Sequence, residues 1–283
     1  MRTQALRALC EGVGVVGQRL GLHRWHRSGL DAVMMYHSVR DPASVRDHTS
    51  DITVSEFRRH IRYFDRAFEI VDLAAIQDPA PSRKQIALTF DDGYRDFYTN
   101  VLPVLHEFDV PATVFVITGF LDNANPREQV MNTGHLFDTL TSDQVRELAD
   151  DPLVTVGNHT RTHHDVGSHD RRDIIESEVL GAKRDLETRF GIEPDRFCYP
   201  NGGYNETSVD VVGSSHAVAT MDESMRPLVG NEHPALIPRV DGGLPFERIQ
   251  WRLSDLNGEL MRLLGRANER QRLSPSTSDQ SFR

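Results

Sequence analysis

Two adjacent carboxylates, Asp91 and Asp92, follow directly after the apolar run 86–90 and precede Gly93. Carboxylates next to a buried strand are costly unless something neutralises them, and a divalent cation does so. One carboxylate of such a pair can bind a metal while its neighbour stays free as a general base. The bare motif also fits an ordinary strand-to-helix turn with an aspartate N-cap.

A pair of histidines provides the second chemical signal. His159 and His163 are four residues apart and follow an apolar segment at 153–156. One helical turn would place both imidazoles on one face, as in known pairs of metal ligands. With Asp92 they make three protein ligands and leave a position for water, which is how catalytic zinc sites are built. Two neighbouring histidines are expected to be exposed bystanders: His164 and His169.

Strands and helices that position these residues alternate along the chain. Apolar runs predict strands at 32–37, 86–90, 112–117, 153–156, 196–199 and 217–220, and apolar residues three and four apart predict helices at 55–68, 141–149, 173–190 and 246–264. This alternation predicts a mostly parallel α/β sheet covered by helices, either open or closed into a barrel. In such folds the chemistry lies at the carboxyl ends of the strands.

A third loop, at 196–205, also follows a predicted strand. It contains Pro200 and two glycines, which are typical of a tight turn, and Tyr204, which is a candidate wall of a pocket. On turn chemistry alone, a purely structural role fits this loop equally well.

Together these segments resemble the polysaccharide deacetylase family, also called carbohydrate esterase family 4 or the NodB-homology domain. The sequence TFDDG at 89–93 matches the first family motif, and the segment from His159 to His163 (HTRTH) matches the second, H-[ST]-x-x-H. The resemblance covers roughly residues 31–250. It implies a distorted (β/α) barrel of about seven repeats in a single domain. It also implies hydrolysis of N-acetyl groups on the amino sugars of a polysaccharide or oligosaccharide.

The resemblance also implies roles for individual residues. Asp91 corresponds to the catalytic base, and the implied metal ligands are Asp92, His159 and His163. One divalent ion is expected, with zinc favoured and other first-row metals also compatible with these ligands. A backbone amide after the proline of the third motif corresponds to the oxyanion donor, which here is Asn201 or its neighbour.

The chain departs from the commonest family pattern around the third motif and at both ends of the barrel. Cys198 stands where the family usually has an arginine, and Arg239 is the expected substitute. The usual C-terminal histidine is missing. Family members with a Y-H-S start bring the acid from the N-terminal side, so His37 is the candidate general acid; a structural histidine bonded to the nearest carboxylate is the alternative.

Residues 121–140 are longer and more polar than a simple connection, which predicts a substrate-side loop.

Composition limits the partners of the 283-residue chain. It carries 32 Lys and Arg against 42 Asp and Glu, a formal net charge of −10, which argues against nucleic acid as a partner. No apolar run reaches the length of a membrane span, and two cysteines cannot build a disulfide framework.

The ends of the chain differ from its body in composition. We expect an N-terminal helical extension at 1–28, a deacetylase domain at 29–265 and a disordered tail at 266–283. The extension lacks the unbroken apolar run of a secretory signal, which favours the cytoplasm over secretion. Peripheral membrane contact of this extension stays open.

Two alternative functions remain at this point. One is a metal-dependent amidohydrolase of the same fold that acts on a small non-carbohydrate amide. The other is a catalytically silent carbohydrate-binding domain, against which the intact motifs argue. Release of acetate from N-acetylglucosamine oligomers would favour the deacetylase, and activity confined to cyclic amides or ureides would favour the first alternative.

Overall fold

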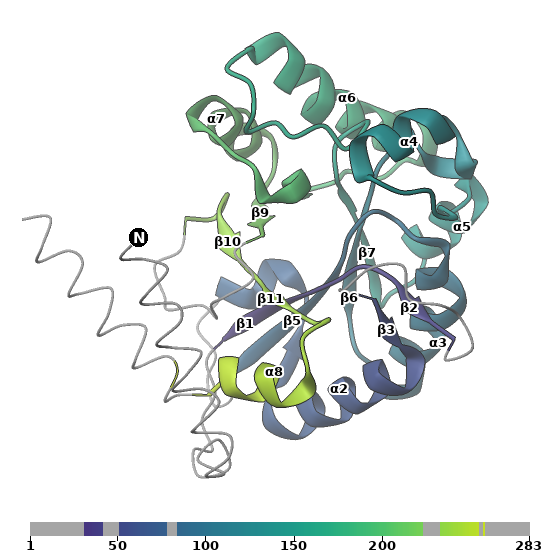
Figure 1. Ribbon diagram of the computed structural model, residues 1–283, viewed down its shortest axis with the longest axis vertical. Coiled ribbons are helices and arrows are strands. Elements are labelled where there is room, and N and C mark those ends of the chain that lie inside the picture. The colour runs from purple at the N-terminus through teal and green to yellow at the C-terminus, as the bar shows by residue number, and fades with distance from the viewer. Residues whose placement is uncertain (1–30, 42–50, 78–83, 223–232, 255–256, 258–283) are drawn as a thin grey trace, which may run out of the picture.

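A parallel sheet forms the centre of the molecule (Figure 1). The computed structural model describes residues 31–41, 51–77, 84–222, 233–254 and 257. Within them the sheet has nine strands in the order β10-β9-β8-β7-β6-β5-β1-β11, with β4 beside β5. Their bounds are β1 (Ala32–Tyr36), β4 (Glu69–Val71), β5 (Gln85–Phe90), β6 (Ala112–Val116), β7 (Val154–Asn158), β8 (Arg196–Cys198), β9 (Val218–Met221), β10 (Ile237–Pro238) and β11 (Val240–Asp241). A separate pair joins β2 (Val39–Arg40) and β3 (Ile52–Thr53).

One short segment closes the sheet into a barrel. Strand β10 pairs with β9, strand β11 pairs with β1, and only Arg239 separates β10 from β11. The two ends of the strand order are therefore joined through residues 237–241, which nearly closes the sheet, while β4 pairs with β5 alone. The predicted distorted (β/α) barrel is confirmed, and each of the six strands predicted from the sequence is present.

Helices lie around the outside of the sheet in Figure 1. They are α2 (Val54–Ala67), α3 (Leu102–Phe108), α4 (Pro126–Thr133), α5 (Ser142–Ala149), α6 (Arg172–Phe190), α7 (Glu206–Ser215) and α8 (Phe246–Arg252). Short 3₁₀ turns lie at Leu73–Gln77, Leu121–Asn123 and Pro200–Gly202, and Phe97–Val101 is π-helical. None of the described helices is long and apolar enough to span a bilayer.

Local sequence signals explain several helix ends. Helix α2 begins at a capping box in which Thr53 accepts from Glu56, and α5 begins at the equivalent pair of Thr141 and Gln144. Helix α6 ends at Gly191, which adopts the left-handed conformation that favours glycine. The predicted N-terminal helix and C-terminal tail lie outside the described residues, as does most of 253–264, so α8 covers only the start of the predicted last helix.

The side chains of each strand alternate between the helices and the barrel interior. On β5, Ile86 and Leu88 pack in the layer beneath the helices, whereas Ala87 packs inside the barrel. Phe115 of β6 fills the interior because Gly157 of β7 leaves room for it; a Cβ at 157 would lie 2.5 Å from the Phe115 ring. Side chains therefore fill the barrel interior, and the residues that follow the strands lie at its carboxyl end.

Candidate metal centre and acid–base pair

A cavity of about 190 Å³ opens at the carboxyl ends of the barrel strands. Residues from widely separated parts of the sequence meet in its wall. All site residues predicted from the sequence except Tyr204 line the cavity. The predicted residues that line it are His37, Asp91, Asp92, His159, His163, Asn201 and Arg239. The strand-end loops therefore bring the sequence motifs together, as the fold predicts.

One oxygen of Asp92 faces both motif histidines. Asp92 Oδ1 lies 3.2 Å from His159 Nε2 and 3.3 Å from His163 Nε2. All three side chains are buried, and Asp92 Oδ1 has no hydrogen-bond partner among the described residues. Burial raises the pKa of the Asp92 carboxyl, but the positive charge and hydrogen bonding of the neighbouring histidines in their protonated form outweigh this and hold that pKa below its usual range. An ionised, unpartnered carboxylate oxygen between two imidazoles is a donor set suited to a divalent cation.

The second nitrogen of each ring contacts a backbone carbonyl. His159 Nδ1 is 2.9 Å from the carbonyl oxygen of Cys198, and His163 Nδ1 is 3.3 Å from that of Asn132. A carbonyl only accepts, so each Nδ1 carries a proton; when the ring is neutral, as a metal ligand must be, its Nε2 has a free lone pair on the side of Asp92. This is the outer-shell arrangement that fixes the tautomer of metal-binding histidines. The residues therefore fit a single metal ion.

The histidines do not converge by way of a helical turn, and that part of the sequence interpretation is wrong. Thr160 and His163 have φ values of 65° and 60°, in the left-handed region, so residues 159–163 form a loop. After β7 the chain turns, and Thr160 N donates a hydrogen bond to Asn158 Oδ1 at 2.9 Å. This turn brings His163 back to the cavity wall.

Asp91 is paired with the expected substitute arginine. Arg239 Nη1 and Nη2 each lie 2.7 Å from an oxygen of Asp91, and Nη1 also lies 3.2 Å from Thr89 Oγ1. The exposed fractions are 4% for Asp91 and 1% for Arg239, so this bidentate pair is almost fully desolvated. Burial raises the pKa of Asp91, but the Arg239 charge and hydrogen bonds more than offset it and keep the carboxyl ionised.

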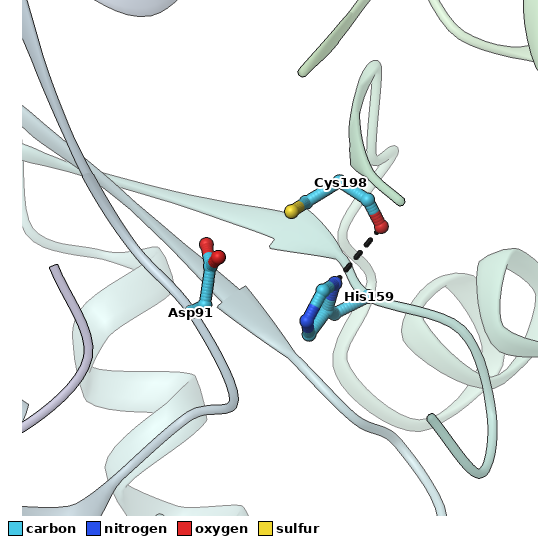
Figure 2. A group of neighbouring side chains, drawn as sticks. All are labelled: Asp91, His159 and Cys198. Atoms are coloured by element: carbon cyan, nitrogen blue, oxygen red, sulfur yellow. Dashed lines mark hydrogen bonds between the residues drawn. The ribbon is translucent and has the colours of Figure 1, made fainter. Parts of the chain in front are cut away.

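Asp91 also lies near His159 and the Cys198 thiol (Figure 2). Ligand atoms of these three residues lie within 4.8 Å of one another. They do not fit a metal, because Arg239 occupies both Asp91 oxygens and His159 Nδ1 is bonded to the Cys198 carbonyl. Figure 2 shows that this last bond is made by the backbone of Cys198 and not by its sulfur.

His37 stands beside Asp91 at the end of β1. Its Nε2 is 4.0 Å from Asp91 Oδ2, and its side chain is 26% exposed. Asp96 fixes the residues that follow, because its carboxylate accepts from the Ser38 hydroxyl and, at 3.2 Å, from Val39 N. His37 thus lies in the cavity wall, beside Asp91 and partly exposed.

The segment 121–140 reaches the cavity, in agreement with the predicted substrate-side loop. Thr133 and His135 line the wall, and His135 Nε2 is 2.7 Å from the hydroxyl of Tyr94. Tyr94 also lines the cavity and was missed from the sequence, although it follows the D-D-G motif directly.

Tyr204 lies elsewhere, so its predicted place in the wall is wrong. Its exposed fraction is 44%. The next residue, Asn205, caps α7 and donates to the carbonyl of His169 at 2.7 Å. This bond holds the chain next to Tyr204 against the loop that contains His169. The rings of His164 and His169 stack on each other 4.7 Å apart, and neither lines the cavity. Asn201, in a left-handed conformation, does reach the cavity, together with Tyr199 and Gly202 of the same loop.

Comparison with known proteins identifies a matching family model and similar proteins. The polysaccharide deacetylase family model matches residues 78–217, a range that includes both aspartates and both histidines but neither His37 nor Arg239. YxkH of Bacillus subtilis is 28% identical over 183 residues, which cover 62% of this chain and 58% of YxkH. The poly-beta-1,6-N-acetyl-D-glucosamine N-deacetylase of Escherichia coli K12 is 32% identical over 222 residues, which cover 66% of this chain and 32% of that protein.

A solved structure shows the same fold. The Streptococcus pyogenes deacetylase PplD, in complex with acetate, superposes with a TM-score of 0.63 at 20% identity, over 80% of this chain and 98% of that one. This chain thus matches almost all of PplD in fold, whereas it spans less than two thirds of the length of the two sequence relatives.

Proposed function

Because this chain belongs to the polysaccharide deacetylase family, we propose that it hydrolyses N-acetyl groups on the amino sugars of a polysaccharide or oligosaccharide. The observation that carries the proposal is the juxtaposition of two different carboxylates in one cavity. Asp92 faces two imidazole nitrogens, and Asp91 is held ionised by Arg239. One carboxylate is suited to binding a cation and the other to accepting a proton.

The metal would be held by Asp92, His159 and His163. When bound, it would supply Lewis acidity, which lowers the pKa of a water molecule and polarises the amide carbonyl. Zinc fits a set of two imidazoles and one carboxylate, and other first-row metals share this ligand preference.

Proton transfers fall to residues of the chain itself. Asp91 accepts the proton of the attacking water, and Arg239 keeps its carboxylate ionised and oriented for that step. His37, 4.0 Å from Asp91, donates a proton to the amine nitrogen as its bond to the acetyl carbon breaks. The products are acetate and the free amino sugar. Asn201 lines the cavity, and its backbone amide is our proposed donor to the oxyanion.

A β-1,6-linked N-acetylglucosamine oligomer is the first substrate to test, because the Escherichia coli relative bears the name of a deacetylase for that polymer. The chain would be stripped of metal with a chelator and incubated with this oligomer, with and without added zinc, while released acetate is measured. We expect acetate only when metal is present.

A pair of variants makes the test specific. Asp91→Asn should retain zinc and lose most turnover, whereas Asp173→Asn, an exposed carboxylate of α6 paired with Arg171, should behave as the parent does. Full turnover in metal-free protein would refute the metal, and an Asp91→Asn variant as fast as the parent would refute the proposed base. Hydrolysis of cyclic amides without any acetate release would favour the small-amide alternative.

A further inference from the structure

Glu178 of helix α6 binds the loop that separates the two histidine ligands. One oxygen, Glu178 Oε2, accepts from Arg161 N at 3.1 Å and from Thr162 N at 2.8 Å. The other, Oε1, accepts from the Thr162 hydroxyl at 2.9 Å. A single carboxylate thus receives three hydrogen bonds from two consecutive residues that lie between His159 and His163.

The same turn of α6 also holds the chain just before His159. Asn158 Nδ2 donates to the carbonyl of Val179 at 2.9 Å, and Asn158 Oδ1 accepts from Thr160 N. The backbone is therefore anchored to α6 on both sides of His159. These anchors are needed because Thr160 and His163 adopt left-handed conformations that non-glycine residues rarely hold without support from their surroundings.

We propose that Glu178 is a positioning residue for the metal site: its carboxylate sets the loop conformation that directs His159 and His163 at the same oxygen of Asp92. Within the described part of the chain, the hydrogen bonds of Glu178 go to residues 161 and 162 and not to a ligand side chain, so Glu178 acts through the loop. The inference rests on the metal centre of the proposed function. Arg161 adds a separate anchor at the loop surface, where its guanidinium pairs with Asp185 at 2.9 Å.

Zinc affinity is the readout that separates positioning from simple structural support. It would be measured on the full chain by competition with a chromophoric chelator, alongside thermal unfolding of the metal-free and zinc-loaded forms. Glu178→Met keeps the length of the side chain and removes both acceptors. We expect its zinc affinity to fall 10- to 100-fold, the range for lost outer-shell contacts. A tenfold loss corresponds to about 1.4 kcal/mol less stabilisation by saturating zinc.

Two further variants provide the controls. In Glu178→Gln the amide oxygen can accept from both backbone N–H groups and the amide nitrogen can donate to the Thr162 hydroxyl, so affinity should stay close to that of the parent. Glu176→Met removes a carboxylate of the same helix that pairs with Arg172, and it should leave zinc affinity unchanged.

Several outcomes would overturn the proposal. If Glu178→Met lowers the stability of the metal-free and zinc-loaded forms equally, Glu178 is only structural. If Glu178→Gln loses as much affinity as Glu178→Met, charge and not loop geometry is responsible. A parent chain that binds no zinc would refute this inference together with the metal centre. Normal zinc binding with the expected variant pattern but no acetate release would refute the deacetylase function alone.

Discussion

Replacing Arg239 by methionine removes the guanidinium that contacts both oxygens of Asp91 at 2.7 Å. Because the two side chains are only 4% and 1% exposed, the carboxylate left behind would be a buried, unpaired charge. Breaking a buried pair in this way costs about 3–5 kcal/mol. We expect Arg239→Met to lower the free energy of unfolding by that amount, measured by urea denaturation of metal-free protein at pH 7.

A double-mutant cycle isolates the pair from the other contacts of Arg239. That residue also lies near Thr89 Oγ1 and the Met221 carbonyl, and losing those contacts adds to the cost of the single variant. The contacts cancel when Asp91→Asn, Arg239→Met and the double variant are compared. We expect a coupling energy of at least about 2 kcal/mol, because the double variant leaves no unpaired charge.

The exposed pair of Arg58 and Glu107 is the matched control. Its atoms are 2.8 Å apart, but its side chains are 35% and 40% exposed. Water screens such a pair, and its coupling energy should be about 0.2–1 kcal/mol. If the Asp91–Arg239 cycle gave a coupling energy no larger than this control, the buried pair would not stabilise the carboxylate as we argue.

The pH dependence of the same variants provides an independent check. In the parent, Arg239 outweighs burial and holds the pKa of Asp91 below its usual value, so the pair stabilises the fold above the unfolded pKa and loses that contribution as the pH falls through the folded pKa. In Arg239→Met, burial raises the pKa of Asp91, opposed only by the weaker effects of His159 and His37, and protonation relieves the penalty. The stability difference between parent and variant should therefore shrink as the pH falls from 7 toward 4. A constant difference would contradict this reasoning.

Three further predictions concern the metal and the fold. Zinc should raise the unfolding temperature of the metal-free parent but not of Asp92→Ala, and an equal rise in both would place the metal elsewhere. Burial, with a smaller effect from Lys183, lowers the pKa of His216 to about 3. Between pH 6.5 and 3, His216 is therefore protonated in the unfolded chain but not in the folded chain. Stability at pH 5 should be about 2 kcal/mol lower than at pH 8 through this group, and His216→Gln should remove that part of the slope in urea denaturation. Gly157→Ala should cost about 1–3 kcal/mol, because its Cβ would lie 2.5 Å from Phe115, and Phe115→Leu should make the alanine better tolerated if that contact is the cause.

The strand-end motifs could be predicted from sequence because local patterns determine them. An apolar strand that ends at Asp91 and Asp92 must place those carboxylates at one edge of the sheet, whatever the rest of the chain does. Arg239 follows only from the family resemblance, as the substitute for the arginine missing at position 198, because the two-residue strands on either side of it are too short to be predicted from the sequence.

The loop between the histidines could not be predicted in the same way. A four-residue spacing favours a helical turn when only the local sequence is considered. The observed loop depends on Glu178, which lies 16 residues from Thr162, and no periodic pattern links the two. Tyr94 and His135 are likewise joined across 41 residues by a hydrogen bond that the sequence does not reveal.

The small side chain at position 198 and the arginine at position 239 are best understood as one arrangement. Cys198 is fully buried in the barrel interior, and its ligand atom lies within 4.8 Å of those of Asp91 and His159. An arginine at position 198, as in the commoner family pattern, would compete with Arg239 for the Asp91 carboxylate, because both guanidinium groups would have to fit in the same barrel interior. With cysteine at 198, the segment that closes the barrel between β10 and β11 can supply the guanidinium instead. Closure of the sheet and control of the Asp91 charge thus depend on the same residue, so a change at position 239 should alter stability and proton transfer together.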